Sequence, residues 1–111
     1  MPKTWAIEQS DTHVLVTRRK PVRWDISATV EFPPCHPLRL AHQIRQDMWR
    51  DLQKIKGFCP AVEITLSDPF IVKAGGRVSR HIPPRANERI EALLSDPALR
   101  KRWLAFARYR T

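Results

Sequence analysis

The feature that most constrains the fold is an unbroken alternation of apolar and polar residues over 22–32, VRWDISATVEF. Successive side chains of a β-strand point to opposite faces, so this pattern predicts a strand with one buried face and one solvated face. Pro33, Pro34 and Pro37 follow and end the strand. The residues predicted to point inward are Val22, Trp24, Ile26, Ala28, Val30 and Phe32.

Three helices are predicted after the prolines. The first covers 37–56, with Gly57 placed to end it and Pro60 unable to continue it. The second covers 84–95, and the third starts after Asp96, a suitable N-cap, with Pro97 in the first helical position. The first helix has the apolar stripe Leu40, Ala41, Ile44, Met48, Leu52 and Ile55, and the third has the packing face Leu99, Trp103, Leu104 and Phe106.

Shorter apolar runs predict the remaining strands. Residues 4–9 and 13–19 form a hairpin around Ser10-Asp11, and 61–66, 70–74 and 77–82 form three further strands, with Gly75-Gly76 as a two-residue turn. The expected fold is therefore α+β: a single domain over 1–111, with an antiparallel sheet and the order βββα-βββαα.

The two halves also resemble each other in sequence. IEQSDTHVLV (7–16) aligns without a gap with ITLSDPFIVK (64–73), and FPP (32–34) corresponds to IPP (82–84). One interpretation is an internal βββα duplication. The other is that Ser-Asp turns and Pro-Pro ends of strands are common in unrelated sequences. The sheets of two such units could join edge to edge or pair in a homodimer, because an unpaired edge strand needs cover.

Length and composition define the class of protein. With 111 residues, 42% of them hydrophobic, the chain forms one core. It has no secretory or membrane-spanning apolar run, so we expect a cytoplasmic protein without a membrane partner, in which both cysteines stay reduced.

The FPPCHP stretch (32–37) places Cys35 beside His36, which suggests a thiol nucleophile or a metal ligand. Cys59 lies beyond the predicted helix, about 30 Å away at roughly 1.5 Å per residue, so the two cysteines cannot share a disulfide or a metal. Neighbours on an extended chain also point apart. We therefore interpret the stretch as the entrance to the helix, and predict no metal, no cofactor and no catalytic residue.

No nucleotide-binding or nucleophile-elbow motif is present, and helix-spaced acids such as Asp47 are expected to pair with neighbours such as Arg50. An enzyme is thus the third-ranked function.

Positive charge is the main functional signal. The net charge is +9, and thirteen of the twenty Lys and Arg residues lie in three segments without acids, at 12–24, 69–87 and 97–111. Such a chain attracts polyanions, and the planar guanidinium group binds phosphate in a bidentate manner. The sequence predicts a small basic protein that contacts nucleic-acid phosphates without strong base readout, through Arg18, Arg19, Lys20, Arg23, Arg77, Arg80, Arg100, Lys101 and Arg102.

Two alternatives remain at this point. The basic surface could dock an acidic protein, as an adaptor or oligomerising module, or it could only keep the protein soluble. Residues 37–95 have the predicted element order αβββα of double-stranded RNA-binding domains. However, the second helix begins PPRANER where that family has a lysine-rich cluster, so the order alone does not assign the chain to it.

Overall fold

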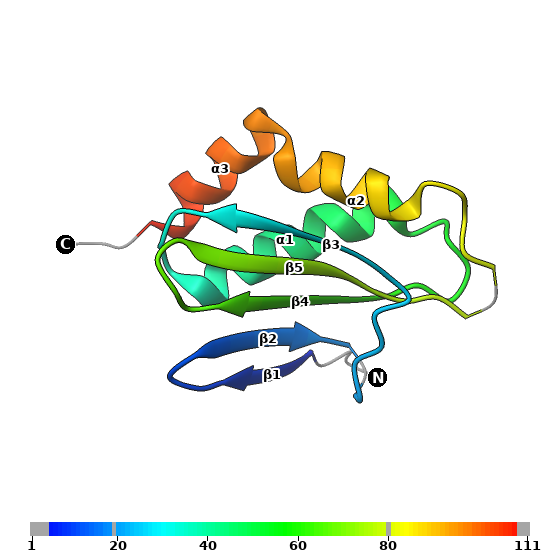
Figure 1. Ribbon diagram of the computed structural model, residues 1–111, viewed down its shortest axis with the longest axis horizontal. Helices are drawn as coiled ribbons and strands as arrows, with labels where there is room; N and C mark the ends of the chain where they lie inside the picture. The colour runs from blue at the N-terminus through cyan, green and yellow to red at the C-terminus, as the bar shows by residue number, and fades with distance from the viewer. Residues whose placement is uncertain (1–4, 19, 80, 109–111) are drawn as a thin grey trace.

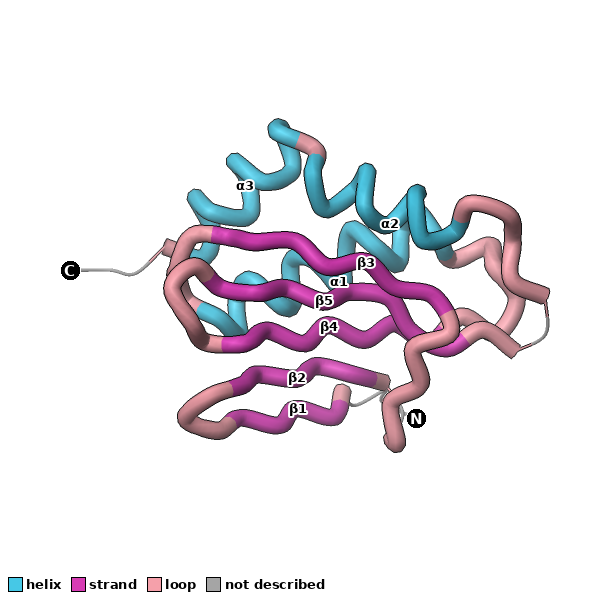
Figure 2. The backbone as a smooth tube through the Cα atoms, in the orientation of Figure 1, coloured by secondary structure: helices cyan, strands magenta, loops and turns pink. Residues whose placement is uncertain are grey.

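The computed structural model describes residues 5–18, 20–79 and 81–108. They form one five-stranded antiparallel sheet with three helices on one face (Figures 1 and 2). The strands are β1 (Ala6–Gln9), β2 (His13–Thr17), β3 (Ile26–Phe32), β4 (Cys59–Thr65) and β5 (Phe70–Arg77). The helices are α1 (Pro37–Leu52), α2 (Ala86–Ser95) and α3 (Pro97–Ala107). The predicted α+β fold with an antiparallel sheet is confirmed.

The strand order in space is β1-β2-β4-β5-β3, so the hairpins of the two halves join into a single sheet. Helix α1 packs on β4 and β2, while α2 packs on β3. The core face of the sheet is built by alternate residues in register, such as Val14 opposite Ile64 and Val62 opposite Ala74, all of which are buried. Within residues 5–18, 20–79 and 81–108, the opposite face carries no helix.

The predicted order is wrong in its second half. Residues 70–77 form one continuous strand, and no strand follows over the described part of 78–82. Two strands, rather than the three predicted, therefore lie between α1 and α2. Gly75 and Gly76 therefore lie inside β5 and do not form a turn. Their φ angles are +156° and +147°, and a Cβ atom at either position would collide with a backbone oxygen, of Ile26 or of Cys59. Glycine is needed here because neighbouring strands approach closely. An internal βββα duplication stays a prediction.

The long alternating segment is also shorter as a strand than predicted. β3 begins at Ile26, and residues 20–25 lead to it at the far edge of the sheet from β2 (Figure 1). Trp24 was predicted to face the core, but it lies against Lys73, whose Nζ is 4.6 Å from the centre of the indole ring. Lys73 pairs with Glu63 and Thr29 on the face without helices. Trp24 thus covers part of the open face.

The helices begin close to where the sequence predicts, but α1 ends at Leu52 with Gln53 as its C-cap, so Ile55 and Gly57 lie beyond it. Leu40, Ala41, Ile44, Met48 and Leu52 of α1 are all buried, and Asp96 caps α3 by accepting hydrogen bonds from the N–H groups of Ala98 (2.9 Å) and Leu99 (3.2 Å). Trp103 is fully buried as predicted. Leu104 and Phe106 are the exceptions, because 36% and 56% of their surfaces are exposed, so neither belongs to the packing face of α3. None of the described helices is long and apolar enough to cross a membrane.

The two edges of the sheet differ. On β3, the side chain of Asn87 from α2 accepts a hydrogen bond from the N–H of Ser27 (2.8 Å), and Arg100 from α3 donates to the carbonyl of Glu31 (2.8 Å). These side chains occupy two outward-facing backbone groups of the edge strand and so hinder its pairing with another chain. At the other edge, no helix packs on β1 in the described part of the chain.

Candidate functional site: a tryptophan flanked by arginines

Several of the basic residues selected from the sequence are neutralised within the fold. Lys20 forms an ion pair with Glu8, and Arg23 makes a bidentate pair with Asp25 at 3.0 Å to each oxygen. The Asp25 carboxylate also accepts a hydrogen bond from the N–H of Val78 (3.0 Å). This bond and the Arg23 contact hold the pKa of Asp25 below its usual value. The Arg23–Asp25 pair therefore helps to hold residues 23–25 against the end of β5.

Two of the α3 residues also hold the structure together. Arg102 forms an ion pair with Asp47, a buried carboxylate of α1 that also accepts a hydrogen bond from the Trp103 indole nitrogen (2.6 Å). The predicted Asp47–Arg50 pair is present at 3.8 Å, as a weaker partner of the same carboxylate. Arg100 donates to the carbonyls of Leu94 (3.0 Å) and Glu31. Because their donors are already engaged, these arginines offer little to an external anion.

The remaining predicted residues do not form one surface. Arg77 ends β5 on the face without helices, while Lys101 is exposed on α3 with no ion pair within the described residues. Arg19 and Arg80 lie outside the described residues. The connection that follows β2 and helix α3 lie on opposite sides of the molecule (Figure 1). The acid-free segments of the sequence are therefore spread over separate places in the fold.

Arg18 is different, because it belongs to a compact group with Trp5, His42 and Arg45, here called the Trp5 cluster. The guanidinium carbon of Arg45 lies 4.3 Å from the centre of the Trp5 ring, and that of Arg18 lies 5.6 Å from it. Both distances are within the range of a cation–π interaction. No carboxylate in the described part of the chain pairs with either arginine. Two guanidinium groups thus share one aromatic ring without a neutralising acid.

The fold brings these side chains together from three elements. Ile7 of β1 is in register with the buried Val16, so Trp5, two residues earlier, also falls on the helix side of the sheet. Arg18 follows β2 directly and has the same parity as Val16. His42 and Arg45 are one turn apart on α1, which packs on β2. The Trp5 cluster therefore lies between the first hairpin and α1.

The electrostatics of the Trp5 cluster are unfavourable in the absence of a ligand. Burial, and secondarily the charge of Arg18, lowers the pKa of the Arg45 guanidinium. Burial, and secondarily the charge of Arg45, also lowers the pKa of His42. In addition, the Arg45 Nε is buried and has no hydrogen-bond partner. An anion bound at this point would relieve the repulsion and could accept that hydrogen bond.

Sequence reasoning found only Arg18 of this group. His42 does not belong to the apolar stripe predicted for its helix, and Arg45 is one of three arginines in α1, all outside the acid-free segments. The available signal was that Arg45 flanks the apolar stripe of α1 and so lies next to the sheet. Charge counted along the chain cannot detect this, because the partners come from distant segments.

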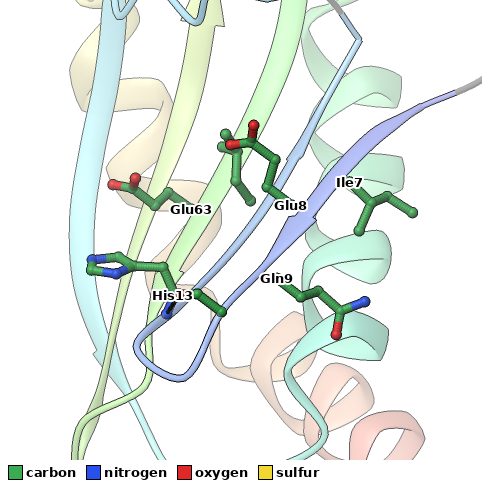
Figure 3. Close-up of a pocket in the computed structure, with 7 residues that line it drawn as sticks. Ile7, Glu8, Gln9, His13 and Glu63 are labelled. Carbon is green, nitrogen blue, oxygen red and sulfur yellow. Dashed lines mark hydrogen bonds between the residues drawn. The ribbon is translucent and has the colours of Figure 1, made fainter.

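A second candidate is a shallow hollow of about 560 Å³ beside the first hairpin. Glu8, His13 and Glu63 point to the face of the sheet without helices, whereas Ile7 and Gln9 point to the other face (Figure 3). Glu8 is paired with Lys20, and the Nδ1 of His13 is 2.8 Å from the hydroxyl of Thr12. The lining groups diverge, so they do not form the convergent geometry that acid–base catalysis requires.

The opening Cys35-His36 pair has a structural role here. His36 is the N-cap of α1 and accepts a hydrogen bond from the N–H of Arg39 (3.4 Å), which agrees with the interpretation of this stretch as the entrance to the helix. Cys35 is buried, and burial raises the pKa of its thiol to about 11. Among the described residues, no group of three or more His, Cys, Asp or Glu side chains is placed to hold a metal ion.

The chain matches no protein-family model, and no curated protein or solved structure matches it significantly.

Proposed function

We propose that the protein binds nucleic acid through its phosphates, and that the Trp5 cluster is the centre of the binding surface. The observation that supports this most strongly is the position of Arg18 and Arg45 over one Trp5 ring without a carboxylate partner in the described chain. Guanidinium groups match phosphate oxygens in geometry and charge. A net charge of +9 adds long-range attraction to any polyanion.

Contact with phosphates fits this surface better than contact with bases. By their register, the strand residues on the face without helices include no Phe, Trp or Tyr. Trp24 lies on this face from the connection before β3, but its ring is in contact with Lys73. The paired strand aromatics of an RNA-recognition sheet are therefore not found among the described residues. Trp5 itself is occupied by two guanidinium groups. The proposal therefore includes affinity with little sequence preference.

The test is a fluorescence anisotropy titration with labelled duplex and single-stranded oligonucleotides at low salt. Arg45→Gln should raise the Kd for the oligonucleotides about tenfold, because one charge-assisted contact to phosphate is lost. Its fold should survive, because the Arg45 Nε makes no hydrogen bond that could be lost. Lys101→Gln removes the same charge from exposed α3 and should change Kd less than twofold, roughly. Absence of binding by the wild type to both oligonucleotides would refute the proposal.

A second candidate is docking of an acidic protein, for which the exposed Phe106 is the specific observation. Phe106 presents an apolar ring next to a basic helix, a combination found at protein interfaces. Polyglutamate used as a competitor separates the two functions. Two results together would favour an acidic protein as the partner. Polyglutamate would displace the oligonucleotide at equal charge concentration, and Phe106→Ala would weaken the binding of polyglutamate but not the binding of the oligonucleotide.

A further inference from the structure

Strand β1 presents a free edge whose hydrogen-bonding groups can be identified. The hydrogen bond from the N–H of Ser10 to the carbonyl of His13 (2.9 Å) shows which residues of the hairpin direct their backbone N–H and C=O groups toward the partner strand, since these residues alternate along β1. Ala6 and Glu8 therefore direct their backbone groups toward β2, while Trp5, Ile7 and Gln9 direct theirs away from the sheet. At the opposite edge, Asn87 and Arg100 occupy the N–H of Ser27 and the carbonyl of Glu31, and α2 packs on β3. Only one edge of the described sheet is therefore open to a further strand.

The side chain at the centre of this edge is also uncovered. Ile7 lies on the helix side of the sheet, yet 42% of its surface is exposed because no helix packs on β1 in the described part of the chain. An exposed apolar side chain on an open edge strand is the usual signature of strand pairing between chains. In Figure 1 β1 forms the outer border of the sheet, with nothing described beyond it.

We propose that β1 pairs antiparallel with β1 of a second copy, around a two-fold axis at Ile7, to form a continuous ten-stranded sheet. In this register Ile7 lies opposite its own symmetry mate, and Trp5 lies opposite Gln9. Ala6 then lies opposite Glu8, so no two carboxylates face each other. A register centred on Glu8 would place like charges directly opposite each other, which is destabilising.

The same arrangement brings the two Trp5 clusters to one side of the assembly. A two-fold axis perpendicular to the sheet keeps both helix layers on the same face, and Trp5 directly precedes the paired strand. Each copy carries a net charge of +9, so the copies repel each other and the association is weak at low salt. Added salt screens this repulsion and should strengthen the dimer. Nucleic-acid binding has the opposite salt dependence.

Sedimentation velocity of the full chain, in low and in high salt, tests the proposal. The protein concentration should reach about 1 mM, because half of the chains are then in dimers if the dimer Kd is also about 1 mM. The wild type should dimerise more strongly in high salt, by at least threefold in Kd, roughly. Ile7→Lys places two like charges on the axis and should abolish the dimer. Thr29→Lys, which adds the same charge on the closed β3 edge, should leave it intact.

A backbone variant separates strand pairing from side-chain effects. Ile7→Pro removes an N–H that points away from β2, so the hairpin should persist while the dimer is lost. Amide exchange should show slower exchange of Ile7 and Gln9 as the protein concentration rises. A wild type that stays monomeric in every condition, or a dimer that survives Ile7→Lys, would overturn the proposal. Neither result bears on nucleic-acid binding, which the Arg45→Gln titration tests separately.

Discussion

The arginines of this protein divide by what their guanidinium groups touch. Arg23 and Arg102 neutralise carboxylates, Arg100 binds backbone carbonyls, and Arg18 and Arg45 share the ring of Trp5. Of these five arginines, Arg18 and Arg45 are the two with neither an ion pair nor a bonded backbone carbonyl in the described chain. Formal charge alone therefore overstates the binding surface, and the environment of each guanidinium decides which residues can bind a ligand.

Cys35 makes a prediction about pH at the same scale. Burial raises the pKa of its thiol from 9.0 to about 11 in the folded protein. The unfolded chain therefore loses this proton first, and the free energy of unfolding contributed by Cys35 falls as the pH rises from 9.0 toward 11. Urea denaturation at pH 8 and pH 10 should show that the free energy of unfolding falls less between these pH values for Cys35→Ala than for the wild type. The control Cys59→Ala should lose as much stability as the wild type, and equal losses in all three proteins would contradict this account.

Residue-level inference from the sequence succeeded where a local signal was sufficient. The Asp96 and His36 caps and the buried stripe of α1 all follow from contacts within a few residues. The Trp5 cluster could not be inferred in this way, because Trp5, Arg18 and Arg45 come from three elements. Their proximity depends on the order in which the strands join the sheet.

At the scale of elements, Arg100 links three of them. It lies on α3, donates to the carbonyls of Leu94 in α2 and Glu31 in β3, and stacks on Phe32 at 4.7 Å. Arg100→Ala should therefore lower the free energy of unfolding by about 2 kcal/mol, because two charged hydrogen bonds are lost. Lys101→Ala, on the next residue, should change it by less than about 0.5 kcal/mol. Urea unfolding measures both, and equal values for the two variants would show that the link contributes nothing.

The same scale shows where sequence patterns are insufficient. The first hairpin, the long helix and the helix pair were predicted because their signals are periodicity, caps and prolines. Gly75-Gly76 was taken for a turn because paired glycines permit positive φ. In the fold these glycines serve close strand packing in the middle of the sheet. Local sequence does not distinguish these two uses, since only the neighbouring strand decides between them.

For the whole molecule, a charge of +9 should affect the two proposed associations in opposite ways. Contact with phosphates releases counterions and weakens with salt. The proposed pairing of two copies through β1 would bury Ile7 but bring two positively charged chains together. Because salt screens the repulsion between them, this association should strengthen with salt. The sequence predicted the polyanion attraction from composition, but it could not indicate which strand would be left at the edge.

The central claim is that Arg18 and Arg45 contact phosphates, and the salt dependence of binding tests it most directly. Kd for a duplex is measured over a series of salt concentrations, for the wild type and for the double variant Arg18→Gln/Arg45→Gln. The account predicts that the slope of log Kd against log salt decreases by about two in the double variant, one unit for each lost phosphate contact. An unchanged slope, with or without weaker binding, would contradict it.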